Sequence, residues 1–286
     1  FRYDLPDVIN DEVLYGFRSI GLIDYLHSPY QPTPFEWYDE VPGWARLSFH
    51  DHPPLVFWIE HLSFKIFGVN LFGLRFPFIA SGILSVLLLY LIAKELFGSG
   101  AALLSAGILS VNNYHIWISR IGLMESPVIF FILVAVFLFL KALRDQRWFY
   151  PAVVATGLAI LMKYTAAVLL PLFFVYLLWK RRDLLGAKRI ALALGLLILI
   201  LSPVIIYNLK LYAARGHFDF QISYMLGQRV PEWEVRPGRE APGGFVQRFE
   251  NIFLWMKVGY SPLFSAALFL SLLASLRLLK KDQGLQ

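Results

Sequence analysis

Two adjacent carboxylates, Asp11 and Glu12, stand near the start of the chain in a segment outside any apolar run. A carboxylate in such a place can act as a general base, because it can take a proton from an attacking hydroxyl or amine. Asn10 or Asp11 can cap a helix here, and acidic residues suit the positive end of its dipole. An apolar face is predicted by the spacing of Leu14, Phe17, Gly21 and Leu22. The alternative is an ordinary capped amphipathic helix in a membrane interface.

A second group of polar residues is the triplet His50, Asp51 and His52. Imidazole and carboxylate groups bind zinc or manganese, and carboxylate oxygens also suit magnesium. The triplet is therefore a candidate site for a divalent metal ion. The alternative is a solvated polar turn, because a metal site usually needs a further ligand from elsewhere in the chain.

Single ionisable residues near the ends of apolar runs are the remaining candidates: Arg120, Glu125 and Lys163. Arg120 and Glu125 could form a surface ion pair, and Lys163 could extend its amine to the interface. An ionisable residue at membrane depth is nevertheless a candidate for function, because its burial in lipid is unfavourable.

The composition indicates a helical membrane protein. The chain is 58% hydrophobic and 16% aromatic, with a mean hydropathy of +0.59, which is too apolar for a soluble domain of 286 residues. Whole apolar runs favour helices over a barrel, whose strands alternate in polarity. The net charge of +6 falls in short loops and does not indicate a nucleic-acid partner. The absence of cysteine excludes disulfides and thiolate metal ligands.

The first part of the chain, residues 1–70, contains no full span and reads as an extracytoplasmic loop with two juxtamembrane helices. The first begins at the acidic doublet, and the second is expected over 55–67, after Pro53-Pro54. We expect residues 71–286 to form the membrane bundle, with an outer loop at 211–260. Because the chain starts in mid-loop, we also expect it to be a fragment that lacks an upstream span and a C-terminal region.

Seven spans are expected in the bundle. The long apolar run 149–179 is interrupted by Lys163-Tyr164, and we interpret it as a hairpin because only then do the flanking basic clusters share one side. By the positive-inside rule that side is cytoplasmic, so 1–70, 119–126, 163–164 and 211–260 face outward. The expected spans are 76–97, 101–118, 127–143, the two arms of 149–179, 190–207 and 262–279.

Four further stretches follow the acidic doublet in an order that resembles a known family. They are His52-Pro53-Pro54-Leu55, the run Gly-Val-Asn-Leu-Phe-Gly-Leu-Arg-Phe-Pro at 68–77, Ser-Arg-Ile-Gly-Leu-Met-Glu at 119–125, and Gly-Leu-Ala-Ile-Leu-Met-Lys-Tyr at 157–164. Together they resemble the GT-C glycosyltransferases of the protein O-mannosyltransferase and aminoarabinose transferase group. The resemblance covers residues 11–171.

The resemblance implies an all-α polytopic bundle of the GT-C type with outward-facing juxtamembrane helices. It implies a polyprenyl-phosphate sugar donor and a protein, lipid or glycan acceptor. Transfer would take place on the outer side of a bacterial or archaeal cytoplasmic membrane, or in the lumen of the endoplasmic reticulum. Protein glycosylation or assembly of the cell envelope would then be its setting.

The same resemblance assigns roles to individual residues. Asp11 would be the catalytic base and Glu12 would support it. Glu125 stands where the family usually has Asp, and His52 where it often has Lys. Lys163 matches the lysine of the family's short hairpin. Because the leaving group is a phosphate, His52, Arg120 and Lys163 could stabilise its developing charge. One base opposite a departing phosphate predicts a single displacement with inversion.

Other functions remain open at this stage. A transporter or flippase for a lipid-linked or small substrate is the main alternative, although transporters place polar sites near the midplane and these spans carry few ionisable residues. A non-catalytic bundle that binds a lipid or a partner is another. Within the enzyme class, a ligase that moves a whole glycan is also compatible.

Overall fold

The computed structural model describes residues 10–26, 31–228, 230, 233 and 269. The chain divides into two compact units, Phe1–Glu234 and Val235–Gln286, and all described residues except 269 belong to the first. All the regular structure in the described ranges is helical. This confirms the predicted class, an all-α membrane protein.

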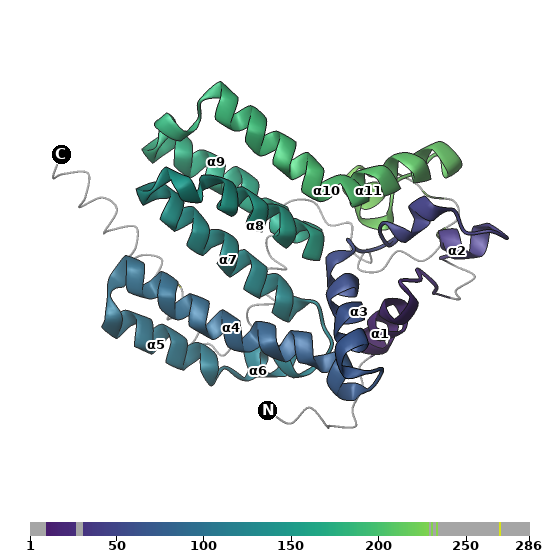
Figure 1. Cartoon of the computed structure of the whole chain (residues 1–286), viewed down its shortest axis with the longest axis horizontal. Coiled ribbons are helices and arrows are strands. Elements are labelled where there is room, and N and C mark those ends of the chain that lie inside the picture. The colour runs from purple at the N-terminus through teal and green to yellow at the C-terminus, as the bar shows by residue number, and fades with distance from the viewer. Residues whose placement is uncertain (1–9, 27–30, 229, 231–232, 234–268, 270–286) are drawn as a thin grey trace. The chain divides into compact units, whose positions relative to one another are not determined.

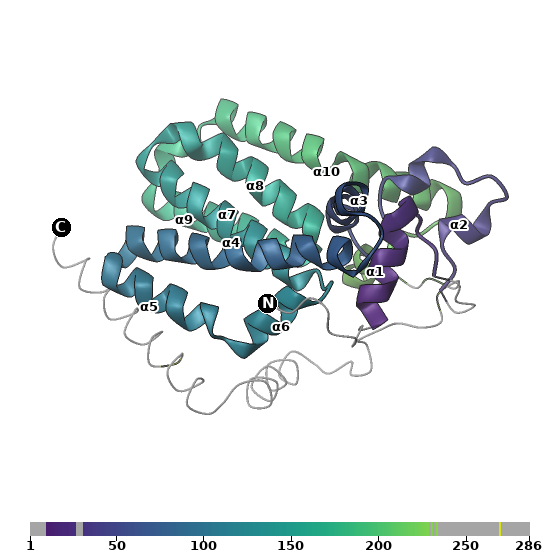
Figure 2. The ribbon, with the colours of Figure 1, turned by 60° about the horizontal axis from the view of Figure 1, so that its bottom comes forward.

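Three helices among the described residues are long and apolar enough to cross a membrane. They are α4 (Leu71–Phe97), α7 (Glu125–Arg144) and α10 (Ala187–Arg215). They coincide with the expected spans 76–97, 127–143 and 190–207. Figures 1 and 2 show them side by side, with shorter helices between and beside them. The total of seven spans stays a prediction, and 262–279 lies outside the described residues.

The expected span 101–118 is instead two shorter helices, which corrects the sequence prediction. These are α5 (Ser99–Ser110) and α6 (Asn113–Arg120). The break has a local cause: the Asn112 side chain accepts a hydrogen bond from the His115 N–H at 2.9 Å, and thereby caps α6. The helix α10 continues to Arg215, so the loop that was expected to begin at residue 211 begins after residue 215.

The predicted hairpin over 149–179 is confirmed. The helix α8 (Phe149–Met162) ends at Lys163, a short 3-10 turn η3 (Tyr164–Val168) follows, and α9 (Leu169–Lys180) runs back. Phe149 at the start of α8 and Leu177 near the end of α9 belong to one buried cluster, so the two helices are antiparallel.

Basic loops meet at one end of the bundle, which we call the basic end (residues 94–95, 141–149 and 180–189). Glu95 binds Lys141 at 3.3 Å and Arg144 at 2.7 Å. Arg189 donates to Gln146 at 2.8 Å, which links the loop before α8 to the start of α10. Two 3-10 turns complete these loops, η2 (Gln146–Trp148) and η4 (Arg182–Leu184). The predicted gathering is therefore confirmed for these three basic clusters, whereas the fourth expected cluster, Arg277 with Lys280 and Lys281, lies outside the described residues.

Short helices gather at the opposite end, which we call the polar end (Figure 1). They are α1 (Asn10–Gly21), α2 (Pro34–Trp37), η1 (Gly43–Arg46), α3 (Leu55–Phe67) and α11 (Phe220–Met225). The two expected juxtamembrane helices are α1 and α3. A buried cluster that includes Tyr15, Phe57, Phe78 and Met124 joins α1 and α3 to α4 and α7, and burial of such large apolar side chains is the main force that holds them there.

Candidate active site at the polar end

Glu12 is the buried member of the acidic doublet. Its side chain is fully enclosed, and Arg75 of α4 binds it through Nε to Oε1 at 2.6 Å and through Nη2 to Oε2 at 2.9 Å. The Gly122 N–H donates to Oε1 at 2.7 Å. A two-pronged Arg–carboxylate contact fixes orientation as well as distance. Glu12 therefore attaches the first turn of α1 both to a membrane helix and to the loop after α6.

Gly122 is required by this arrangement. A Cβ at Gly122 would lie 2.8 Å from Cγ of Glu12, which is too close for any other residue without a shift of the loop. Arg120, expected to bind phosphate, ends α6 two residues earlier and is half-buried. The stretch 119–125 thus contributes to the polar end through its backbone as well as through its side chains.

Asp11, in contrast, is exposed. It precedes Tyr15 by four residues, so the two side chains share one face of α1. Burial raises the pKa of the Tyr15 phenol above its usual value. The nearby charges of Asp11, Asp51 and Glu125 raise this pKa further. Tyr15 also meets the His52 imidazole edge-on, with ring centres 5.5 Å apart. Four candidates from three separate segments therefore lie near one tyrosine.

Glu125 and Lys163 form an ion pair. Lys163 Nζ lies 2.7 Å from Glu125 Oε1, and the two side chains are 30% and 35% exposed. Glu125 begins α7, and Lys163 is the residue at which the hairpin turns. The structure thus brings together two residues that the sequence places 38 positions apart, and it leaves both accessible to solvent.

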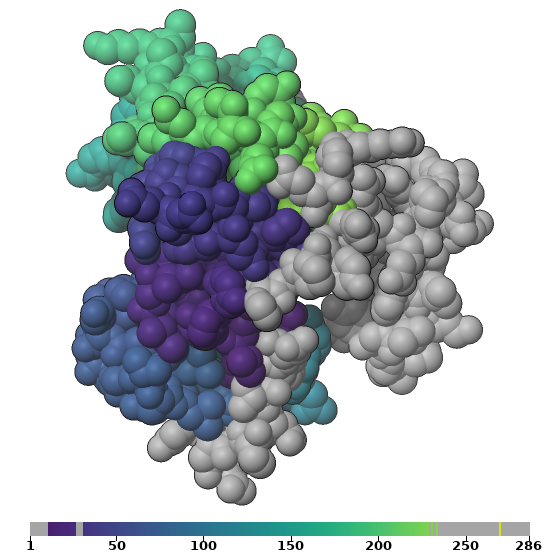
Figure 3. Space-filling view, turned by 90° about the vertical axis from the view of Figure 1, so that its right-hand side faces the viewer, coloured from purple at the N-terminus to yellow at the C-terminus, as the bar shows by residue number. Residues whose placement is uncertain are grey.

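Figure 3 looks onto the polar end and shows α1 between the start of α4 and the segment 31–60. That segment joins α1 through a buried charge network. Arg18 Nη1 binds Asp51 at 2.8 Å, and its Nη2 lies 3.5 Å from Asp24. Asp24 also accepts hydrogen bonds from the backbone N–H of His50 at 2.7 Å and meets its Nδ1 at 2.9 Å. His52 Nδ1 lies 3.0 Å from Asp51. The network holds His52 at the edge of the site.

The electrostatics of this network favour its charged forms. Burial alone raises the pKa of Asp51, but Arg18, His50 and His52 outweigh it and hold this pKa well below its usual range. Burial likewise lowers the pKa of His50, yet the charges of Asp24 and Asp51 raise it above its usual value. Mutual neutralisation therefore stabilises groups that would be costly to bury alone.

The residues expected to bind a metal ion were His50, Asp51 and His52, but the structure groups His50 and Asp51 with Asp24 instead of His52. Among the described residues, the group whose ligand atoms lie within 4.8 Å of one another is Asp24, His50 and Asp51. Both of its carboxylates already contact the Arg18 guanidinium. A cation would have to displace Arg18, so these residues as arranged do not fit a metal ion, and we assign no metal-dependent step to them.

Asp219 is a site residue that the sequence did not reveal. It caps α11 by accepting the Ile222 N–H at 2.8 Å, and its Oδ2 accepts hydrogen bonds from the Tyr164 hydroxyl at 2.7 Å and from Asn208 at 2.8 Å. Burial raises the pKa of its carboxyl. Asp219 ties α11 to the residue after Lys163. An Asp placed before an apolar stretch is a helix-start signal and could have located it.

Glu60 of α3 is a buried carboxyl that faces α1. The Ser19 hydroxyl donates to its Oε2 at 2.5 Å, and Glu60 is fully enclosed. Burial raises the pKa of Glu60 to about 8, and the charge of Glu12 adds to the rise. A neutral Glu60 suits the α1–α3 contact, since an isolated buried carboxylate is strongly unfavourable.

Glu60→Gln is expected to remove part of the pH dependence of stability. The folded protein retains the Glu60 proton to about pH 8, whereas the unfolded chain releases it near pH 4.3, so wild-type stability falls as pH rises between these values. The expected slope is roughly 1.4 kcal/mol per pH unit. Thermal unfolding of both proteins in detergent from pH 5 to 9 measures it. The variant should gain on wild type as pH rises, whereas parallel curves would show that Glu60 is charged in the folded state.

Fold and site together define an all-α membrane protein whose candidate residues, among them Asp11, His52, Glu125 and Lys163, lie at one end of its helices. The profile of one family, described as dolichyl-phosphate-mannose-protein mannosyltransferase, matches residues 51–207. The match covers more than half of the 286 residues. The chain belongs to this family, which confirms the resemblance inferred from the motifs.

Individual relatives agree with this assignment. An uncharacterized protein of Aquifex aeolicus is 38% identical over 48% of the chain and 28% of its own length. The putative mannosyltransferase YycA of Bacillus subtilis is 33% identical over 52% of the chain and 22% of its own length. An undecaprenyl phosphate-alpha-4-amino-4-deoxy-L-arabinose arabinosyl transferase of Pseudomonas paraeruginosa is 30% identical over 55% and 31%. The matched part is therefore under a third of each of these relatives. No solved structure matches.

Proposed function

We propose that the protein is an integral-membrane glycosyltransferase that moves a sugar from a polyprenyl-phosphate donor to an acceptor on the extracytoplasmic side, with inversion. The observation that carries the proposal is the difference in burial between the two acidic residues of the doublet. Glu12 is enclosed and fixed, while Asp11 beside it is exposed. The names of the relatives, a putative mannosyltransferase and an undecaprenyl phosphate arabinosyl transferase, support the donor class.

Asp11 is the base in this mechanism. It takes the proton from an acceptor hydroxyl or amine as that group attacks the anomeric carbon. Glu12 is a positioning residue, because its carboxylate is already bound by Arg75 and by the Gly122 N–H and does not face solvent. Its contacts fix the first turn of α1 and so fix where Asp11 stands. An acid held on a rigid element keeps a reacting pair aligned, and alignment supplies much of the rate.

Lys163 receives the leaving phosphate. In the resting protein its charge is balanced by Glu125 at 2.7 Å, and this pair is open enough for a phosphate to replace the carboxylate. His52, whose ring contacts Tyr15, and Arg120 supply further positive charge or hydrogen bonds to the same group. The phosphate carries negative charge as it departs, so it needs stabilisation by cations more than a proton.

Inversion follows from a single displacement by one base. A retaining reaction would need a second carboxylate free to form a covalent sugar intermediate. Glu12 is enclosed, and Glu125 is bound by Lys163. Of the three candidate carboxylates Asp11, Glu12 and Glu125, Asp11 is thus the exposed one, and no basic side chain among the described residues pairs with it.

The donor's lipid requires an apolar path away from the site. A groove of about 330 Å³ lies between α1, α3 and α4, and Glu12, Gly16, Phe17, Phe64 and Leu74 are among its lining residues. It can receive the first units of an isoprenoid chain beside the doublet. The basic end lies opposite, and the positive-inside rule supports an outward-facing polar end.

The proposal is tested with the full-length protein in liposomes, radiolabelled polyprenyl-phosphate sugars, and a membrane or cell-wall extract as acceptor. Label is expected to move from the lipid to a component of the extract. If no donor supports transfer and the labelled donor instead moves between leaflets, the protein is a lipid transporter and the proposal is wrong.

Lys163→Ala is expected to lower transfer by about 10²-fold, because it removes one stabilising donor from the charge that develops in the transition state. Its effect on stability is expected to be below about 1 kcal/mol, because the Lys163–Glu125 pair is partly exposed. Initial rates at saturating acceptor and thermal unfolding measure the two effects. Lys65→Ala serves as the control, since Lys65 is exposed on α3. Equal transfer rates for Lys163→Ala and this control would show that Lys163 takes no part in the reaction.

A further inference from the structure

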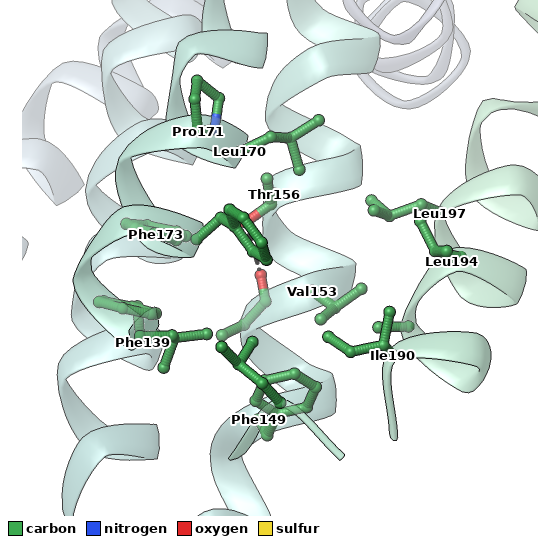
Figure 4. Close-up of a pocket in the computed structure, with 15 residues that line it drawn as sticks. Phe139, Phe149, Val153, Thr156, Leu170, Pro171, Phe173, Ile190, Leu194 and Leu197 are labelled. Carbon is green, nitrogen blue, oxygen red and sulfur yellow. Dashed lines mark hydrogen bonds between the residues drawn. The ribbon is translucent and has the colours of Figure 1, made fainter. Parts of the chain in front are cut away.

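An apolar cavity near the basic end is separate from the candidate active site. It has a volume of about 410 Å³ and lies between α8, α9 and α10, with Phe139 of α7 at one side. In Figure 4, Val153 and Thr156 of α8 form its floor, Phe173 lines the α9 side, and Leu194 lines the α10 side. Its volume falls within the range of small-molecule sites.

The lining of this cavity offers no polar group to a ligand. Thr156 is its one hydroxyl, and that hydroxyl donates to the Ala152 carbonyl at 2.8 Å within α8. The cavity opens sideways, since Leu170, Phe174 and Leu194 at its rim are 38%, 51% and 53% exposed. An occupant must therefore be apolar along this length and reach the cavity from the bilayer.

Positive charge borders one end of the cavity. The guanidinium carbon of Arg189 lies 5.7 Å from the centre of the Phe149 ring, which lines the cavity, and the next residue, Ile190, lines it too. Arg189 itself donates to Gln146 and to the Asp183 carbonyl, both neutral acceptors. Among the described residues, four basic side chains of this loop have no carboxylate within 4.0 Å: Lys180, Arg182, Lys188 and Arg189.

We propose that this cavity binds one acyl chain of an anionic phospholipid, whose phosphate lies against Arg189. An apolar slot that ends at a cation with no carboxylate of the described residues within 4.0 Å matches a chain that ends at an anion. From Ile190 to Leu194 and Leu197, the α10 wall rises about 10 Å at 1.5 Å per residue, so the slot takes the part of the chain nearest the headgroup. In the orientation proposed above, this lipid belongs to the cytoplasmic leaflet, where anionic headgroups attract basic segments.

The bound lipid would stabilise the arrangement of α8, α9 and α10 around the cavity. It would fill the space that separates α9 from α10 above α8, and so support the hairpin whose turn carries Lys163. This site is independent of the proposed transfer reaction, because none of its residues belongs to the polar end.

The proposal is tested by native mass spectrometry of the full-length protein released from nanodiscs that contain phosphatidylglycerol and phosphatidylcholine. Wild type is expected to retain one phosphatidylglycerol. Arg189→Gln should weaken retention about fivefold, as expected for one basic residue at an anionic headgroup. Leu194→Trp, which fills the cavity from its exposed rim, should abolish it. Arg147→Gln is the matched control: it removes the same charge at the basic end, but Arg147 is already bound by Asp145 at 2.7 Å, so retention should change less than twofold.

Other occupants give different results. Equal retention of the two phospholipids, unchanged by Arg189→Gln, would overturn the proposal. If undecaprenyl phosphate displaces the phospholipid from wild type and from Arg189→Gln alike, the cavity belongs to the donor's tail. Retention that persists in Leu194→Trp would place the lipid elsewhere on the protein.

Discussion

Asp11→Asn is expected to lower sugar transfer by about 10²–10⁴-fold, the usual contribution of a general base. The side chain keeps its shape but loses the ability to hold the acceptor's proton. Thermal stability should change by no more than about 0.5 kcal/mol, because Asp11 is an exposed surface position. Transfer rates in liposomes and thermal unfolding in detergent, measured on the same preparations, separate the two effects.

Asp39→Asn is the matched control for this variant, since Asp39 is also an exposed carboxylate near the polar end. It should transfer at the wild-type rate. Transfer that survives in Asp11→Asn and disappears in Glu125→Gln would move the base to Glu125. In that case Lys163 would act by holding this second carboxylate rather than the phosphate.

The doublet illustrates what the sequence could predict. Helix-start chemistry located the beginning of α1, and the charge pattern correctly placed the turn of the hairpin at Lys163. These features depend on neighbours within a few residues or on the sum of charges in short loops, so they can be read along the chain. The sequence alone, however, does not show which of two adjacent acidic residues at a helix start is buried and which is exposed.

The difference between Asp11 and Glu12 depends on residues far away. Arg75 is 63 positions from Glu12 and Gly122 is 110 positions away, and their contacts decide which carboxylate is enclosed. The burial of Arg18 depends on Asp24, just beyond the end of α1, and on Asp51, 33 positions away, and nothing within its own helix predicts it. Arg75 could have been singled out, because a lone charge in an apolar helix indicates a functional or structural partner.

Arg75→Leu is expected to have the largest effect on stability of any variant considered. Arg75 and Glu12 are each enclosed, at 1% and 0% exposure. Removal of Arg75 leaves the Glu12 carboxylate buried without the cation that binds it, which typically costs about 3–5 kcal/mol. Glu12→Gln should cost less, because Gln can still accept the Gly122 N–H and Arg75 has further contacts besides Glu12. Thermal unfolding in detergent at matched expression measures both.

The double variant with Gln at both positions 12 and 75 provides the decisive comparison. If the pair acts as a unit, the double variant loses less stability than the two single variants, Glu12→Gln and Arg75→Gln, added together, since both charges of the pair are then removed at once. Glu125→Gln is the control for an ion pair in an open position and should cost below about 1 kcal/mol. Strict additivity of the two single changes would show that the charges do not interact. The anchoring of α1, and with it the placement of Asp11, would then have to come from the apolar contacts of Tyr15 and its neighbours.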